Sequence, residues 1–479
     1  MDNKMSNKIF WILFFAIFIM GAFFRFYELD LKPLHHDEGE EQYFFIEPLL
    51  DDKVLIWDYD NKGLIRHFIS YPFVRFFGIN AFSLRFTSAL AGTITILLLL
   101  FLMKYIGKQG VLLSSALLSF SPFFIYYSRQ YTPYPFDILF LLILLILILF
   151  YLDSRKRIYL ILISIDLAII FNSNVEAFLL FALVFLIFIY LLFLFKKDIY
   201  LKILTIIRDI SFSYKLVLLF IFLFTFIFFQ TSLFRNFNNL LNFPYSFFNL
   251  ASKTVNTGHN KGFLYYFRII YPYEIGLLFF WLIGIFKFKR NLFSKFLVFW
   301  SCAFLFIFSL IPYKTNWTII YILFPLVLLA GNTFQYLIEN WKTKRLLIIT
   351  FTLLILVTSL YFSIEQNFIH INDFTKNKIG YVETSTDIFR LIDDINNYVD
   401  LNKDSKVLIS AESSWPIPAY LKNLKLSYQT DLIGLNISDY PGYEIFMVNK
   451  DQLVGEYPEF EKREYELRKN YNLIVLYKN

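Results

Sequence analysis

Long apolar stretches dominate the first three quarters of the chain, and short polar or charged segments separate them. A helix needs about 20 mostly apolar residues to cross the hydrocarbon core of a bilayer. Windows of this kind predict eleven spans, near residues 9–24, 82–103, 111–127, 136–152, 158–171, 176–195, 216–230, 274–286, 296–311, 318–337 and 346–363. The pattern therefore predicts a polytopic α-helical membrane protein that keeps its first span.

The pattern changes after residue 363, where charged residues become more frequent and the apolar runs become short. Residues 384–399 have helical spacing, whereas 406–410, 444–448 and 472–477 are typical of buried strands. We therefore predict two domains: a membrane domain over residues 1–363, and a small α/β domain over residues 364–479.

Composition and charge agree with this organisation: 57% of the residues are hydrophobic, 17% are charged, and the net charge is +7. The basic residues gather in short connections such as 153–157, 196–215 and 342–345, so the positive-inside rule places the N-terminus in the cytoplasm. The positive charge orients the chain in a cytoplasmic membrane, and we exclude nucleic acid as a partner. Segments 25–81 and 231–273 and the C-terminal domain are then predicted to lie outside.

The first of these outer segments opens with the densest polar cluster of the chain, the sequence HHDEGEE at residues 35–41. A carboxylate near the membrane surface can act as a general base on a hydroxyl, and partial desolvation raises its pKa into a useful range. His35 and Asp37 could also hold a divalent metal cation that neutralises a phosphate. The structural alternative is a capping box between Asp37 and Glu40, and both roles can hold at once. Helical spacing over 38–50 and 64–77 predicts helices in the membrane interface.

Further basic side chains are expected on the same side of the membrane. Cations at membrane depth are costly unless they pair or extend to the surface, so they are often functional, although extension alone is the simpler alternative. We predict that a set of basic residues surrounds a lipid phosphate while Asp37 and Glu38 face the reacting carbon. This set comprises His36, Arg66, His67, Arg129, Arg268 and Lys314.

Six short segments follow one another along the chain in an order that is recognisable as a set. They are HHDE at 35–38, SPFFIYYSR at 121–129, YE at 273–274, KTNW at 314–317, YVETSTDIFRLIDDI at 381–395 and SSWPIPAYLKN at 413–423. The ordered set resembles the GT-C glycosyltransferases, such as the protein O-mannosyltransferases and the aminoarabinose transferases of lipid A. In particular it resembles the group named for a flippase activity-associated protein of archaeal N-glycosylation. The chain departs from that group at 61–64, which reads NKGL, and after Arg129, where the next acid is delayed to Asp137.

The resemblance implies a membrane enzyme that transfers a sugar from a polyprenyl-phosphate-linked donor, with inversion. The acceptor would be a hydroxyl of a lipid-linked glycan, a lipid or a protein outside the cytoplasmic membrane. It implies that Asp37 is the base or metal-facing carboxylate, that Glu38 is its partner, and that Arg129 and Lys314 lie near the donor phosphate.

Two alternatives belong to other classes of protein. A non-enzymatic flippase or flippase-accessory protein for lipid-linked glycans would need polar residues along its spans, and Asp166 is the main one there. A membrane scaffold that presents its C-terminal domain to partners would give no reason for acids and cations to gather on one side.

Overall fold

The computed structural model describes residues 5–56, 63–173, 175–256, 260–286, 291–371, 373, 376–403, 405–411, 414–428, 437–450, 453 and 457–479. The chain packs as two compact units. The first, here the helical unit, comprises Met1–Tyr27, Val54–Pro72 and Arg85–Ile369. The second, here the sheet unit, comprises Glu28–Lys53, Phe73–Leu84 and His370–Asn479. The first polar segment, residues 25–81, is divided between the two units. The domain boundary at residue 363, which the sequence predicts between the membrane domain and the C-terminal domain, stays a prediction.

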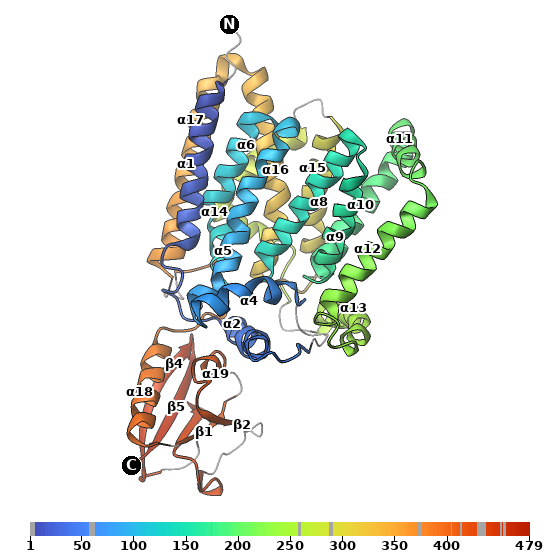
Figure 1. Ribbon diagram of the computed structural model, residues 1–479. Coiled ribbons are helices and arrows are strands. Elements are labelled where there is room, and N and C mark those ends of the chain that lie inside the picture. The colour runs from blue at the N-terminus through green and yellow to red at the C-terminus, as the bar shows by residue number, and fades with distance from the viewer. Residues whose placement is uncertain are drawn as a thin grey trace. The chain divides into compact units, whose positions relative to one another are not determined.

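Helices run through the whole helical unit, and every predicted apolar window coincides with at least one of them. Figure 1 labels most of these helices. They are α1 (Asn7–Phe26), α5 (Ala81–Leu98), α6 (Met103–Phe120), α7 (Pro122–Ser128), α8 (Tyr134–Ser154), α9 (Arg157–Phe171), α10 (Val175–Phe195), α11 (Lys197–Arg208), α12 (Phe212–Gln230), α13 (Asn238–Asn256), α14 (Tyr265–Phe286), α15 (Leu292–Leu310), α16 (Ile319–Asn340) and α17 (Arg345–Ile364).

Eight helical stretches of the described chain are long and apolar enough to cross a membrane. One of them, Ala81–Phe120, contains the predicted window 82–103 and the first part of the window 111–127, and its chain turns at Gly107, where φ is 76°. The windows at 158–171 and 176–195 coincide with α9 and α10 instead. The protein is therefore a multi-pass helical membrane protein, as the sequence predicts.

Helix α16 is the central helix of this unit. It packs against α6, α14 and α15, and 83% of its most apolar window is buried. Small residues allow the close approach to α6: a Cβ added to Gly331 would lie 2.4 Å from the carbonyl oxygen of Gly110. The Ser114 hydroxyl also donates to the Val327 carbonyl at 3.1 Å. Small residues and interhelical hydrogen bonds replace the hydrophobic effect as the packing force inside a membrane.

Two features of the helical unit differ from the sequence-based expectation. Helix α14 begins at Tyr265, so Glu274 lies inside the helix and not at its start, in a kink with φ −130° and ψ 31°. Helices α11 and α13 lie outside all predicted windows. Both combine an apolar stripe with polar residues, and a search for uniformly apolar runs does not detect that pattern.

The sheet unit contains a five-stranded mixed sheet with the order β2-β1-β3-β5-β4. Strand β1 pairs in parallel with β2 and β3, whereas β5 pairs antiparallel with β3 and β4. The strands are β1 (Lys406–Ser410), β2 (Lys425–Tyr428), β3 (Ile445–Asn449), β4 (Phe460–Arg468) and β5 (Tyr471–Lys478). The three predicted strands are β1, β3 and β5. The two edge strands were missed because β2 is short and β4 is largely charged.

Apolar residues cover both faces of this sheet, because successive side chains of a strand point to opposite faces. Val407 and Ile409 belong to one core with Leu391 of helix α18 (Asp387–Leu401), the helix predicted at 384–399. Leu408, between them, belongs to the opposite core. Figure 1 shows α18 along one face of the sheet.

The first polar segment is helical where its spacing predicts helices. Helix α2 (His36–Glu41), the π-helical turn η1 (Gln42–Ile46) and α3 (Glu47–Leu50) follow one another without a break. Helix α4 (Ile65–Phe77) coincides with the second predicted stretch. The residues of α2 contact C-terminal residues within the sheet unit, and these contacts position the acidic cluster.

Candidate active site

His35 starts helix α2. Its Nδ1 accepts the N–H of Asp37 at 3.2 Å, and its own N–H donates to Oε2 of Glu38 at 2.8 Å. The capping box is thus formed by His35 and Glu38, and the predicted pairing of Asp37 with Glu40 is wrong. The prediction missed this arrangement because it considered only an acidic residue as the cap, whereas an imidazole nitrogen is also an acceptor.

The two carboxylates proposed as catalytic differ in accessibility. Glu38 is fully buried and helps to form the cap, whereas the Asp37 side chain is 40% exposed. Asp37 is therefore the carboxylate that a substrate can reach, and Glu38 shapes the start of the helix on which Asp37 lies. The catalytic role of each stays a prediction.

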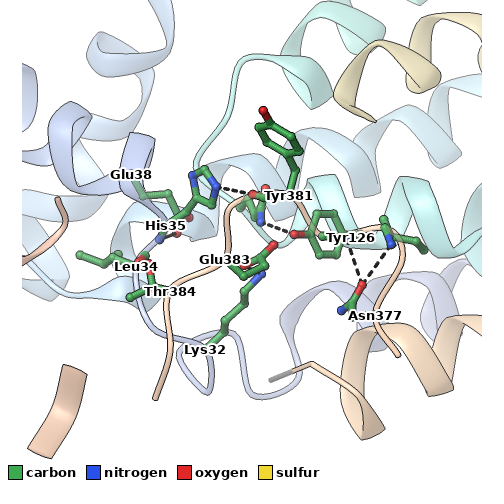
Figure 2. A network of polar contacts seen from close by, with 12 residues as sticks. Lys32, Leu34, His35, Glu38, Tyr126, Asn377, Tyr381, Glu383 and Thr384 are labelled. Carbon is green, nitrogen blue, oxygen red and sulfur yellow. Dashed lines mark hydrogen bonds and ion pairs between the residues drawn. The ribbon is translucent and has the colours of Figure 1, made fainter. Parts of the chain in front are cut away.

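C-terminal residues of the sheet unit fix the chain just before this helix start (Figure 2). His35 Nε2 lies 2.8 Å from the Tyr381 carbonyl, and the Thr384 hydroxyl donates to the Leu34 carbonyl at 2.7 Å. Lys32 forms a buried ion pair with Glu383. These contacts hold the backbone on which Asp37 is presented, as an active-site carboxylate requires.

Gly39 explains why the acidic cluster contains a glycine. A Cβ at this position would lie 2.5 Å from Pro416 Cβ and 2.8 Å from Pro416 Cα, so only glycine lets α2 approach this segment so closely. One turn later, the rings of Tyr43 and Phe44 each lie 5.5 Å from that of Trp415. The WPIP segment of the tail therefore packs directly against the acidic helix.

Three residues of α2 come close enough together to be considered as metal ligands. Ligand atoms of His36, Asp37 and Glu40 all lie within 4.8 Å of one another. His35, which the sequence suggested as a ligand, does not fit, because the Tyr381 carbonyl and the Asp37 N–H occupy its two ring nitrogens. A metal binds an imidazole through a nitrogen lone pair that nothing else occupies.

Two of the predicted cations of the helical unit, Arg129 and Lys314, are bound to backbone carbonyls. Arg129 Nη1 donates to the carbonyls of Phe24 and Tyr27, at 3.1 and 2.6 Å, at the end of α1. Lys314 is only 1% exposed, and its ammonium donates to the carbonyls of Lys261 and Ile311. Burial lowers the pKa of Lys314. Both side chains thus stabilise helix ends and turns, whatever else they bind.

Arg66 and His67 begin helix α4, and both are almost fully buried. The Arg66 guanidinium lies 5.9 Å from the ring centroid of Tyr131, and His67 Nδ1 is 2.8 Å from the Tyr131 hydroxyl. Arg268 differs from the other predicted cations because it is exposed on α14. Four of the five basic residues predicted in the helical unit are therefore buried, and the fifth is not.

Aromatic rings connect the segments that carry Arg129 and Lys314. Tyr134 lies 5.8 Å from Tyr127, which is two residues before Arg129, and stacks at 6.2 Å on Trp317, which is three residues after Lys314. The helical unit thus brings together the SPFFIYYSR and KTNW segments, which are far apart in the sequence.

Sequence reasoning did not predict the burial of several charged residues of the helical unit, and Asp137 and Arg25 are two of them. Asp137 accepts hydrogen bonds of 2.5 Å from both Ser173 and Tyr321. Arg25 is 1% exposed and donates to the carbonyls of Gly21 and Leu118, at 2.9 and 2.8 Å. Their signal in the sequence is a charge inside the end of a predicted apolar helix, and such a residue needs a partner.

Comparison with known proteins agrees with this architecture. The family model described as dolichyl-phosphate-mannose-protein mannosyltransferase matches residues 62–227. No curated protein matches the sequence. The structure of ArnT from Cupriavidus metallidurans bound to undecaprenyl phosphate is similar, with a TM-score of 0.67 and 13% identity over 98% of each chain.

Two further solved structures are similar. The oligosaccharyltransferase of Archaeoglobus fulgidus, in complex with zinc and sulfate, has a TM-score of 0.57 and 12% identity over 91% of this chain and 68% of that chain. The arabinofuranosyltransferase AftD from Mycobacteria has a TM-score of 0.56 and 10% identity over 100% of this chain and 40% of that chain. The chain thus has a fold similar to that of ArnT over nearly its whole length, and residues 62–227 match the model of the dolichyl-phosphate-mannose-protein mannosyltransferase family.

Proposed function

We propose that the protein transfers a sugar from a polyprenyl-phosphate-linked donor to an acceptor hydroxyl on the outer face of the cytoplasmic membrane, with inversion. The observation that carries the proposal is Asp37, a partly exposed carboxylate at a helix start whose flanking residues are all anchored. The GT-C fold and the match to a mannosyltransferase family support it. The acceptor would be a lipid-linked glycan, a lipid or a protein.

In the proposed step, Asp37 takes the proton of the acceptor hydroxyl while that oxygen attacks the anomeric carbon. The new glycosidic bond forms as the bond from the anomeric carbon to the phosphate oxygen breaks. The polyprenyl phosphate leaves with the electron pair of that bond. A single displacement from the opposite face inverts the configuration of the anomeric carbon.

The basic residues of the helical unit would bind the phosphate of the donor. An ammonium has three N–H donors, and Lys314 uses two of them on the Ile311 and Lys261 carbonyls; in the proposed complex the third would donate to a phosphate oxygen. Arg129 and Arg66 would add guanidinium charge that stabilises the leaving phosphate.

The test is a transfer assay with a purified Asp37→Asn variant and a polyprenyl-phosphate-linked sugar. Asparagine has nearly the same shape as aspartate but cannot take the proton, so we expect transfer to fall by about 10²- to 10⁴-fold. Asp51→Asn is the matched control, because Asp51 is an exposed acid next to the same helical segment. Full activity of the Asp37→Asn variant would remove Asp37 from catalysis.

A translocation assay beside the transfer assay distinguishes a transferase from a flippase. A protein that only translocates lipid-linked glycans would move a fluorescent lipid-linked sugar across vesicle membranes and would form no glycosidic bond. We expect the opposite result: product forms, and translocation does not exceed that of protein-free vesicles.

A further inference from the structure

Arg468 reaches the acidic helix from the end of strand β4, next to an irregularity in the pairing of β4 with β5. It is 8% exposed, and its Nη2 donates to the Trp415 carbonyl. The same nitrogen lies 2.8 Å from His36 Nδ1. A cation from the C-terminal strand is thus built into the cluster of His36, Asp37 and Glu40.

This contact fixes the tautomer of His36. A guanidinium has only donors, so Nδ1 of His36 must accept with its lone pair and the ring proton must be on Nε2. Nε2 lies 3.2 Å from Oε1 of Glu40, one helical turn later, and can donate its proton there. Both nitrogens of the ring are therefore occupied by protein groups.

The tautomer bears on metal binding. The ligand atoms of His36, Asp37 and Glu40 are close enough to hold a cation, and zinc binds imidazole and carboxylate readily. A metal on Nε2 would require the proton to move to Nδ1, where it would point at an Arg468 N–H. Two donors cannot hydrogen bond to each other, so metal binding would require Arg468 to move away.

Charge acts in the same direction as geometry. Burial lowers the pKa of Arg468, and the negative charges near it, those of Asp37 and Glu40 among them, act in the opposite direction. The guanidinium, held 2.8 Å from His36 Nδ1, brings a positive charge to the cluster that His36 forms with Asp37 and Glu40.

We propose that Arg468 is a built-in counter-cation of the α2 cluster: it holds His36 in a tautomer that no metal can use and so excludes divalent cations from the site. Arg468 acts as a positioning residue. If Asp37 is the base of the proposed transfer, this exclusion keeps its carboxylate available for the acceptor proton. Only this role for Asp37 rests on the proposed function.

The test is a zinc titration of the purified full-length protein by calorimetry, with wild type, His36→Gln, Arg468→Met and the double variant His36→Gln/Arg468→Met. We expect wild type and His36→Gln to bind zinc alike. Arg468→Met should gain one site, with at least about tenfold higher affinity than wild type has, and the double variant should lose it. A gain that depends on His36 would not follow from a purely structural role of Arg468.

Two results would overturn the proposal: a zinc site in wild type that His36→Gln abolishes, or no gained site in a folded Arg468→Met variant. If Arg468→Met does not fold, the zinc affinities of wild type and His36→Gln are compared instead. Equal affinities support the exclusion of metal from the native cluster, and a site that only wild type has contradicts it. These titrations measure no sugar transfer. Full activity of Asp37→Asn would therefore contradict the proposed function and leave the zinc result standing.

Discussion

Charged side chains are held differently in the acidic helix of the sheet unit and in the helical unit. At the start of α2, the carboxylate of Glu38 accepts a backbone N–H, while Asp37 stays partly exposed. In the helical unit, Arg129 and Lys314 are buried and donate to backbone carbonyls at the C-terminal ends of α1 and α15. Carboxylates suit the N-terminal end of a helix and cations suit the C-terminal end, because each complements the partial charge there.

The difference separates residues that can react from residues that hold the fold. A partly exposed carboxylate on an anchored backbone can meet a substrate. A buried guanidinium or ammonium that holds several carbonyls cannot be removed without exposing those carbonyls to an apolar environment. We therefore expect substitutions at the buried charges to cost stability and substitution of Asp37 to cost activity.

The largest effect on stability is expected at the buried ion pair between Lys32 and Glu383, which shows that the sheet unit also contains a buried cation. Lys32→Met leaves the Glu383 carboxylate buried without its counter-charge, so we expect the free energy of unfolding to fall by about 3–5 kcal/mol.

A denaturant titration of the detergent-solubilised protein measures this loss. The double variant Lys32→Met/Glu383→Leu is the control, because removing both charges should restore most of the stability. If the single variant lowers the free energy of unfolding by less than about 1 kcal/mol, the prediction is wrong. The pair would then contribute no more than an exposed ion pair does.

The next effect is expected at Arg129. Arg129→Met removes two charge-assisted hydrogen bonds to the end of α1, and each is worth about 1.5–3 kcal/mol, so we expect a loss of about 3 kcal/mol. Arg268→Met is the matched control, because this exposed arginine should change stability by less than about 0.5 kcal/mol.

Denaturant titration and the KM for the donor distinguish the two possible roles of Arg129. If Arg129→Met keeps its stability and shows only a raised KM, the guanidinium serves the donor phosphate and not the end of α1. The buried charges of the helical unit would then include a substrate-binding group, and they would differ less from the acidic helix of the sheet unit than we infer.

A smaller effect is expected at Gly39, where the acidic helix meets the C-terminal segment. In an open helix, Gly→Ala would stabilise by about 1 kcal/mol, but here the new Cβ would lie 2.8 Å from backbone Cα of Pro416. Because backbone cannot move aside cheaply, we expect Gly39→Ala to cost about 1–3 kcal/mol. Gly262→Ala is the control, since no heavy atom lies within 4 Å of its added Cβ. Equal thermal midpoints for the two variants would show that α2 does not need this close approach.

Sequence patterns predicted the fold well where one physical signal is strong. Uniform apolar runs located the membrane helices, and three buried strands and α18 lie where their spacing predicts. The edge strand β4 was missed because its side chains are largely charged, and α11 and α13 because their apolar stripes are narrow. These are elements whose formation depends on what packs against them, which no local pattern records.

The candidate site was predicted in part. The sequence indicated the acidic cluster and its surroundings, but it paired Asp37 with Glu40 as a cap where the structure has His35 with Glu38. Arg468, which comes from the other end of the chain, has no local signal because its meaning depends on a neighbour more than 400 residues away.

By itself, the sequence determined that this chain lies in a membrane, which stretches form its apolar helices, and that an acidic cluster follows the first span. These properties follow from solvation and helical spacing, which act locally. Only the tertiary structure decided which acid is exposed, which histidine caps α2, and which cation neutralises the cluster. Burial and hydrogen-bond partners come from chain segments that folding brings together, so they are not encoded at any one position.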